Sequence, residues 1–194
     1  DIESLPFLEA IRQFRKDAGA ENVMYIHVTL IPTVGRWDEI KTKPTQHSVI
    51  KLREIGITPD VLICRTRVPL PDEVRAKISL FTDVAHNAVI ESLDVDTIYE
   101  IPLLFERAGL ARLTLHRLGL PDLPPDLSEW EQIVERLKRP RTRCRIALVG
   151  KYIENRDSYI SIAEAFQHAG AANDAAVEID WVDSSELEQV DAAE

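Results

Sequence analysis

The chain has 194 residues, is 45% hydrophobic and carries a formal net charge of −10 at pH 7. This acidic balance argues against general binding to nucleic acid or to a membrane surface. No apolar run approaches the roughly 20 residues that span a bilayer. Since the start shows no signal-peptide pattern and two cysteines make no disulfide or metal framework, we expect a soluble cytoplasmic protein of one domain, or of one plus part of another.

The first part of the chain alternates helical and strand patterns. Ser4 is a candidate N-cap of a helix that Gly19 ends. The patterns that follow are a buried strand at 23–32, a helix at 47–56, a buried strand at 60–65, a helix at 71–81, a strand at 88–92 and helices at 101–110 and 115–120. This alternation predicts an α/β fold with a parallel sheet, in which ligands bind at the carboxyl ends of the strands.

Prolines and basic residues become frequent after residue 120. We interpret 121–143 as an interdomain linker that holds a short helix with a capping box of Ser128 and Glu131. A strand pattern at 145–152, a helix at 158–170 and a strand at 176–184 follow. The predicted organisation is therefore a first domain at 1–120, the linker, and the start of a second α/β domain at 144–194.

The segment KTKPTQ, residues 41–46, lies between the first predicted strand and the helix after it. Lysines and the free N–H groups of a helix start can together bind a triphosphate. Lys41, Lys43, the Thr45 hydroxyl and the Gln46 amide are candidates for one anion. The segment lacks the glycines of a Walker A loop. A solvated turn rich in lysine explains the same residues equally well.

Three other residues have a functional and a plainer interpretation. Lys77 lies on the helix that follows the second strand, where a surface lysine is the simpler reading. Phe81 ends the same helix, and a core position is simpler than stacking on a base. Glu3 can hydrogen-bond a base or ribose edge, but an exposed glutamate of a first turn is simpler.

Several residues with reactive side chains receive a structural interpretation. Cys64 is expected to be buried in a strand without chemistry. His47 and His86 have no partners at metal-ligand spacing. The pair Asp94 and Asp96 fits a loop with capping aspartates better than a catalytic site. Trp37, in GRWDE, is expected to pack within its loop.

Five segments resemble one family. DIESLPFLEAIRQ, KTKPTQHSV, DVDTIYEIPLL, LSEWE and VGKYIENRDSY occur in this order in the CTP synthases, and the resemblance covers nearly the whole chain. The resemblance implies the back half of a P-loop, dethiobiotin-synthetase-like ligase domain, followed by the start of a class I glutaminase domain of flavodoxin-like fold.

The resemblance also implies an activity. CTP synthases are ATP-dependent amidoligases in which ATP, with Mg²⁺, phosphorylates the 4-oxygen of UTP and ammonia from glutamine displaces that phosphate to give CTP. GTP activates the glutaminase step, CTP inhibits, and the enzyme is a homotetramer with nucleotide sites between subunits. No nucleic-acid or membrane partner is expected.

The family's site residues carry over by motif. The triphosphate site shared by UTP and CTP is implied at Lys41, Thr42, Lys43, Pro44, Thr45, Gln46 and Lys77. The inhibitory CTP site is implied at Asp1, Ile2, Glu3 and Phe81. A segment near the ATP adenine is implied at Leu93, Asp94 and Val95.

The family's catalytic and metal-binding residues have no counterparts here. Its P-loop lysine and magnesium ligands would precede Asp1, and its glutaminase nucleophile would follow Glu194. Cys144 starts a strand and is not that nucleophile. We therefore expect an internal fragment that is inactive alone and, because its sheet edges are exposed, poorly soluble. A truncated, non-catalytic nucleotide-binding or interaction module is the alternative. The pairing of KTKPTQ with Lys77 argues against another amidoligase of the dethiobiotin-synthetase type.

Overall fold

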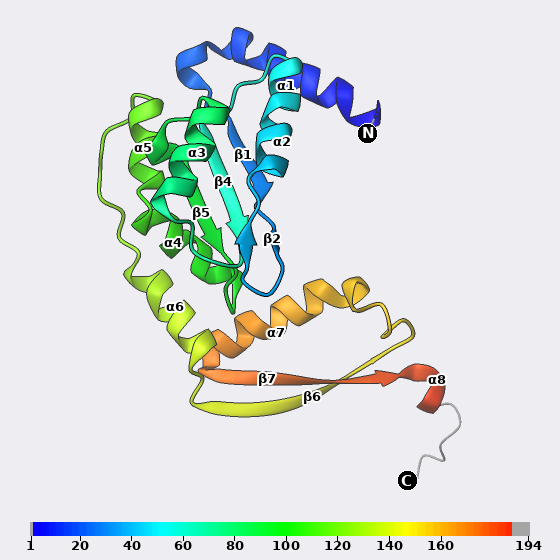
Figure 1. The fold of residues 1–194 in the computed structure, drawn as a ribbon. Helices are drawn as coiled ribbons and strands as arrows, with labels where there is room; N and C mark the ends of the chain where they lie inside the picture. Colours follow the sequence, from blue (N-terminus) through cyan, green and yellow to red (C-terminus); the bar gives the residue numbers. More distant parts are fainter. Residues whose placement is uncertain (1, 188–194) are drawn as a thin grey trace. The chain divides into compact units, whose positions relative to one another are not determined.

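The structure, a computed structural model, describes residues 2–187, except for the side chains of residues 2 and 186 (Figure 1). The chain divides into two compact units, Asp1–Pro125 and Asp126–Glu194. Each unit contains a parallel pairing of strands. The predicted α/β architecture with parallel strands is confirmed.

A three-stranded parallel sheet forms the centre of the first unit, in the order β1-β4-β5. Its strands are β1 (Ile26–Leu30), β4 (Val61–Thr66) and β5 (Val89–Leu93). Two crossover helices, α2 (Lys43–Glu54) and α3 (Asp72–Thr82), connect them and pack side by side (Figure 1). Because all three strands are parallel, their carboxyl ends lie at one edge of the sheet.

The core of this unit is built around β4. Val61, Leu62, Ile63 and Cys64 are all buried, as expected for a strand covered on both faces. The buried core cluster consists of Ile31, Val49, Val61, Leu62, Ile63, Cys64, Leu70, Ile78, Val84, Ala88, Val89 and Ile90. The predicted burial of Cys64 is confirmed.

The first strand is less buried than its sequence predicted. Ile26, Val28 and Leu30 are exposed large hydrophobic residues of β1. Residues two apart lie on one face of a strand, and α2 contacts β1 from the other face, where Thr29 meets Thr45. The expectation of a wholly buried strand is therefore wrong, because an apolar run does not reveal which of its faces is covered.

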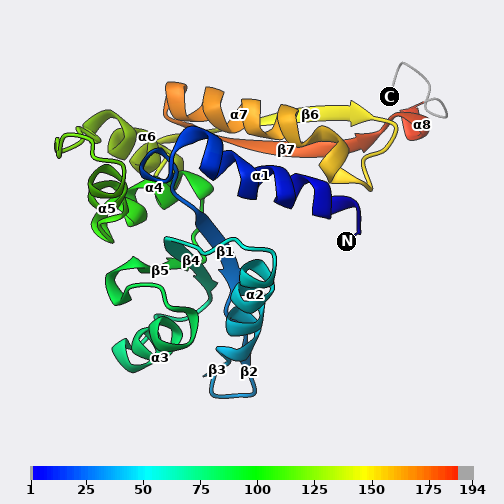
Figure 2. The same cartoon turned by 90° about the horizontal axis from the view of Figure 1, so that it is seen from above.

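A hairpin that the sequence did not predict separates β1 from α2 (Figure 2). Its strands are β2 (Thr33–Val34) and β3 (Glu39–Ile40), and the Lys41 amide donates to the Pro32 carbonyl over 2.9 Å at its base. Trp37 is 92% exposed in the connection, so the expectation that it packs within its loop is wrong.

The N-terminal helix α1 (Leu5–Ala18) follows a 3-10 turn, Ile2–Ser4, and Gly19 ends it with a φ of 88°. Ser4 occupies the N-cap position of α1, as predicted, but it has helical backbone angles and its side chain makes no capping hydrogen bond. Tyr25 contacts the helix at its middle and in its last turn: the Tyr25 hydroxyl donates to the Ile11 carbonyl, and the Arg15 guanidinium lies 5.0 Å from the centre of the Tyr25 ring.

The remaining elements of the first unit are short. They are the 3-10 turns Ala20–Asn22, His86–Ala88 and Ile98–Glu100, and the helices α4 (Ile101–Arg107) and α5 (Leu110–Arg117). Arg117 ties α5 to the start of the sheet, because its guanidinium donates to Asp60 over 2.9 Å and to the Ala20 carbonyl over 2.9 Å.

The second unit has a helix followed by a βαβ arrangement. Its elements are α6 (Ser128–Lys138), β6 (Thr142–Gly150), a 3-10 turn at Arg156–Tyr159, α7 (Ile160–Asn173), β7 (Ala175–Asp183) and α8 (Ser184–Leu187). Strands β6 and β7 pair in parallel, and α7 packs on β7.

Two expectations for this unit are wrong. Ser128 is the first residue of α6 and not its cap; its amide donates to the Asp126 carboxylate over 3.0 Å. Hydrogen bonds from the Ser128 side chain and from its amide lower the pKa of Asp126 below its ordinary value. Gly170 lies inside α7 and does not end it. A glycine is needed at this position because an added Cβ would meet the Ala175 carbonyl oxygen at 2.4 Å. The left-handed residue that ends α7 is Asp174.

Across the described part of the chain, no helix combines the length and the apolar character that a membrane crossing requires.

Candidate functional site

The KTKPTQ segment is the beginning of a helix and not a loop. Helix α2 starts at Lys43, so residues 43–46 form its first turn, and Lys41 and Thr42 directly precede it. The expectation of a loop is wrong because Pro44 is tolerated in a first helical turn. The helix start lies against the carboxyl end of β1, since the Thr45 hydroxyl donates to the Leu30 carbonyl over 3.3 Å.

Two threonines of this segment are turned inward. Thr42 is 6% exposed and Thr45 is fully buried. The Thr45 hydroxyl also accepts from the Thr29 hydroxyl over 3.3 Å. The sequence-based suggestion that this hydroxyl points at an anion is therefore corrected: its partners are in β1, and it anchors the helix to the sheet.

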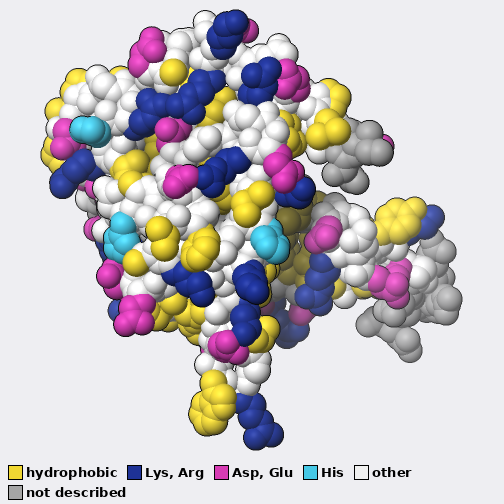
Figure 3. Space-filling model, turned by 45° about the horizontal axis from the view of Figure 1, so that its top comes forward, with side chains coloured by type: hydrophobic (Ala, Val, Ile, Leu, Met, Phe, Trp, Pro, Cys, Tyr) yellow, Lys and Arg dark blue, Asp and Glu magenta, His cyan; other side chains and the backbone are white. Residues whose placement is uncertain are grey.

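The charged side chains of the segment face outward. Lys43 is exposed, and Lys41, which is partly exposed, makes an ion pair with Glu39. The Gln46 amide donates to the Thr42 hydroxyl over 3.1 Å. A helix start has unpaired N–H groups and a partial positive charge, so these cations add to a field that already favours an anion. Figure 3 shows Lys and Arg side chains exposed on the face of the molecule that it draws.

The neighbouring helix α3 presents a third candidate lysine. Lys77 is exposed, and Phe81, four residues later, is 51% exposed. Residues four apart lie on the same helix face, so the cation and the ring share one outward face of α3. The expectation that Phe81 belongs to the core is wrong; Ile78 and Thr82 fill the inner face instead.

The segment after β5 lies at the same edge of the sheet. Leu93 is the last residue of β5, and the Asp94 amide donates to the Thr66 carbonyl, at the end of β4, over 3.2 Å. Asp94 is exposed, while Val95 is partly buried. The hydroxyl of Thr97 accepts from the Tyr99 amide and caps the following turn.

The N-terminal candidate residues precede helix α1. Asp1 lies outside the described residues. Ile2 and Glu3 belong to the 3-10 turn before α1, and the Glu3 side chain is exposed.

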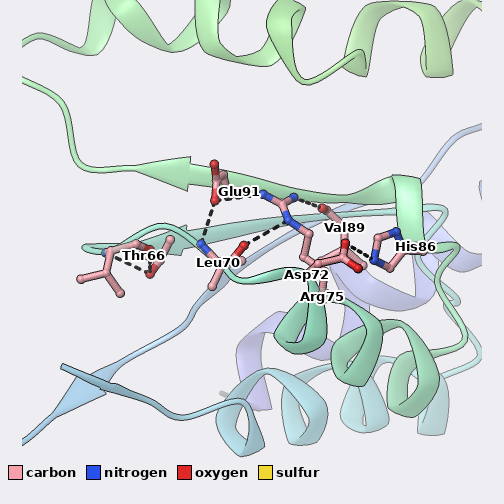
Figure 4. A network of polar contacts seen from close by, with 8 residues as sticks. Thr66, Leu70, Asp72, Arg75, His86, Val89 and Glu91 are labelled. Atoms are coloured by element: carbon pink, nitrogen blue, oxygen red, sulfur yellow. Dashed lines mark hydrogen bonds and ion pairs between the residues drawn. The ribbon is translucent and has the colours of Figure 1, made fainter. Parts of the chain in front are cut away.

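A network that the sequence did not predict joins α3 to β5 (Figure 4). Arg75 donates to the Val89 carbonyl over 2.9 Å and to the Leu70 carbonyl over 3.4 Å. Its guanidinium also lies 2.9 Å from the Glu91 carboxylate, which accepts from the Leu70 amide over 2.9 Å. Arg75, Val89 and Glu91 line a cavity of about 490 Å³. A charged residue within the strand pattern AVIES was the available signal for this network.

Burial changes the titration of two side chains in the first unit. It raises the pKa of Cys64 to about 12, which keeps the thiol protonated. It lowers the pKa of His27, whose Nε2 lies 2.8 Å from the Ser48 hydroxyl between β1 and α2. Within residues 2–187, no group of three or more His, Cys, Asp or Glu side chains is arranged to hold a metal ion.

Comparison with known proteins gives the family. Residues 1–120 match a family model described as the CTP synthase N-terminus. The chain therefore belongs to the CTP synthase family, with residues 1–120 in its N-terminal synthase domain.

Individual relatives extend the similarity over the whole chain. The chain is 58% identical to the CTP synthase of Thermomicrobium roseum over 194 residues, which are 100% of this chain and 35% of that protein. It is 57% identical to the CTP synthase of Methanocaldococcus jannaschii over 188 residues, 97% of this chain and 35% of that protein. The chain spans about a third of the length of these relatives.

The family match also bears on the predicted position of this chain within a CTP synthase. It identifies residues 1–120 simply as N-terminal synthase sequence, so the narrower placement in the back half of a ligase domain has no support from it. Residues 121–194 lie outside this match. Their assignment to a linker and to the start of a glutaminase domain therefore stays a prediction.

Proposed function

We propose that the first unit supplies a binding surface for the triphosphate of UTP and CTP in an enzyme that aminates UTP to CTP. The observation that carries this proposal is the arrangement of cations on adjacent helices. Lys41 and Lys43 lie at the start of α2, at the carboxyl edge of the sheet, and Lys77 projects from the neighbouring α3.

Electrostatics supports the same surface. A triphosphate needs several cationic or N–H donors, and a helix start with two lysines provides both kinds. These lysines stand out on a chain whose net charge is −10. Phe81 shares the outward face of α3 with Lys77 and offers an exposed ring to a pyrimidine. Thr42 and Thr45 serve by holding the helix start in place.

The further ligands of the enzyme are part of this proposal. Leu93, Asp94 and Val95 would contact the adenine of ATP at the end of β5. Asp1, Ile2, Glu3 and Phe81 would contact CTP as an inhibitor. ATP, with Mg²⁺, supplies the phosphoryl group when bound, and its metal ligands would come from other parts of the enzyme. Glutamine-derived ammonia, activation by GTP and a homotetramer are proposed on the strength of the family.

The second unit is proposed to begin a glutaminase domain. Its support is the parallel β6-α7-β7 arrangement, which is the repeating unit of an open α/β sheet. Cys144 is exposed near the start of β6, far along the strand from its carboxyl end at Gly150. Ligand sites of such sheets lie at the carboxyl ends, so Cys144 is not proposed as a nucleophile.

Calorimetric titration of the chain with UTP tests the triphosphate surface. Lys41→Ala and Lys77→Ala should each weaken UTP binding by at least about tenfold, because a charge-assisted hydrogen bond contributes roughly 1.5–3 kcal/mol. The matched control is Lys51→Ala, since Lys51 lies in the last turn of the same α2 and pairs with Glu54. Equal UTP affinity in all three variants would refute the assignment.

A chimera tests the catalytic part of the proposal. The 194 residues would replace the matching segment of the Thermomicrobium roseum enzyme, with which they align over their whole length. Formation of CTP by the chimera, and its loss in the Lys77→Ala chimera, are the expected results. A folded chimera that binds UTP without making CTP would favour a non-catalytic nucleotide-binding module.

A further inference from the structure

The Arg75 network fixes the position of α3 relative to β5 (Figure 4). Its guanidinium reaches two carbonyls and one carboxylate, and the Arg75 side chain is only 24% exposed. Val89 and Glu91 belong to β5, whereas Leu70 belongs to the connection between β4 and α3. One side chain thus joins the helix, the segment that leads into it, and the next strand.

Arg75 and Lys77 are linked through the geometry of the helix. Residues two apart on an α-helix point about 200° apart around its axis. Arg75 is directed toward β5, so Lys77 is directed away from the sheet, where it is exposed. A rotation of α3 that released Arg75 would move Lys77 by the same angle.

The other polar anchors of α3 are at its ends. Nε2 of His86 lies 3.0 Å from the carboxylate of Asp72, the first residue of the helix, and Arg53 of α2 pairs with Asp83, directly after the helix. Asp72 and Asp83 are 84% and 72% exposed. Such exposed pairs contribute little. Within the described residues, the pair of Arg75 with Glu91 is therefore the one ion pair of α3 in which both side chains are mostly buried.

We propose that Arg75 is a positioning residue, which holds α3 at one rotation about its axis so that Lys77 faces the triphosphate. Through Glu91 it couples this helix to β5, the strand whose end carries the segment proposed for ATP. The inference rests on the proposed function of Lys77, and it adds a residue that touches no ligand itself.

The shape of the guanidinium is part of the inference. Arginine presents several N–H donors in a planar fork, so it can bond two carbonyls and a carboxylate together, whereas a lysine ammonium is a single point. In a competing interpretation, Arg75 only caps the exposed edge of the sheet against pairing with another chain. It donates to a carbonyl of β5, which is the last strand in the order of this sheet. That role predicts altered solubility and no effect on UTP.

The test compares Arg75→Met and the milder Arg75→Lys with a matched control, Arg53→Met, which removes an ion pair to the end of α3 without touching β5. UTP affinity is measured by calorimetry on the 194-residue chain. Both Arg75 variants should weaken UTP binding by at least about fivefold, and the control by less than about twofold. Arg75→Met should add little to Lys77→Ala in the double variant, because a misplaced lysine and a missing lysine cost the same contact.

A second measurement needs no nucleotide. Hydrogen exchange of the α3 amides should quicken by at least about tenfold in Arg75→Met while the α2 amides keep their protection. Unchanged α3 protection overturns the inference, whatever UTP does. If Lys77→Ala weakens UTP binding and the Arg75 variants do not, the inference fails and the proposed function stands. If Lys77→Ala has no effect, the proposed function fails, and the coupling to the triphosphate fails with it.

Discussion

The hydroxyl of Thr45 decides between two interpretations of the KTKPTQ segment. If it faces a phosphate, its removal should weaken ligand binding; if it anchors α2, its removal should destabilise the fold. The structure favours the anchor, because Thr45 is fully buried and its hydroxyl bonds Leu30 and Thr29, both of β1. Thr45→Val tests this with little change in side-chain shape.

The expected cost follows from the contacts that are lost. Valine removes the donor to the Leu30 carbonyl and the acceptor for the Thr29 hydroxyl, each at 3.3 Å. A buried polar group left without its partner costs about 1–3 kcal/mol. Because both contacts are long, we expect the lower part of that range, about 1–2 kcal/mol. In a unit of this size each kcal/mol lowers Tm by roughly 3–5 °C.

Thermal denaturation followed by circular dichroism measures the effect, with Thr58→Val as the matched control, since Thr58 is exposed. UTP binding to the folded variant is measured below the transition and should change by less than about twofold, because the Thr45 hydroxyl faces β1 and valine keeps nearly the same shape there. A Thr45→Val protein with unchanged Tm and strongly weakened UTP binding would refute the anchoring role and restore the hydroxyl as a ligand contact.

Three further predictions concern single side chains. Cys64 should resist alkylation at pH 8, because burial raises its pKa to about 12, whereas Cys144 is exposed; mass spectrometry after brief iodoacetamide treatment should find label on Cys144 alone, and rapid labelling of Cys64 would contradict its burial. Burial also lowers the pKa of His27 below its ordinary 6.5, so the unfolded chain binds more protons than the folded one, and the free energy of unfolding should fall as pH drops through 6.5 toward the lowered value. Urea titrations at several pH values should show that His27→Gln removes this pH dependence. A pH dependence that persists in the variant would assign it to another group. Trp37→Ser should change the free energy of unfolding by less than about 0.5 kcal/mol, since Trp37 is 92% exposed; a larger loss in the same titrations would mean that the ring packs against the protein.

The alternation of elements in the first unit was predictable because its signals are local. Apolar runs gave the strands β4 and β5, and the helical spacing of 71–81 gave α3 within one residue at each end. The start of α6 and the end of α7 were predicted wrongly, because each depends on one contact that the local residue pattern does not show. Ser128 resembles a cap, yet Asp126 accepts its amide hydrogen, and Gly170 resembles a helix end, yet it provides close packing against β7.

The residues of the candidate site were likewise predictable in part. Its lysines could be singled out because charge and position after a strand are visible in the chain, and motif order alone indicated the CTP synthase family that the comparison of residues 1–120 then gave. The direction of each side chain was not visible. Thr45 turns into the sheet and Phe81 turns out of it, opposite to the simplest expectation for each.

The sequence by itself determined the family, the order of the elements and the residue types available for a triphosphate, because each depends on residues close together in the chain. Only the tertiary structure decided which faces are covered and which distant groups meet. Arg75 contacts Val89 and Glu91 because two parallel strands and a crossover helix bring them together. Such contacts depend on the packing of β4, α3 and β5, and no spacing of residues within one segment encodes them.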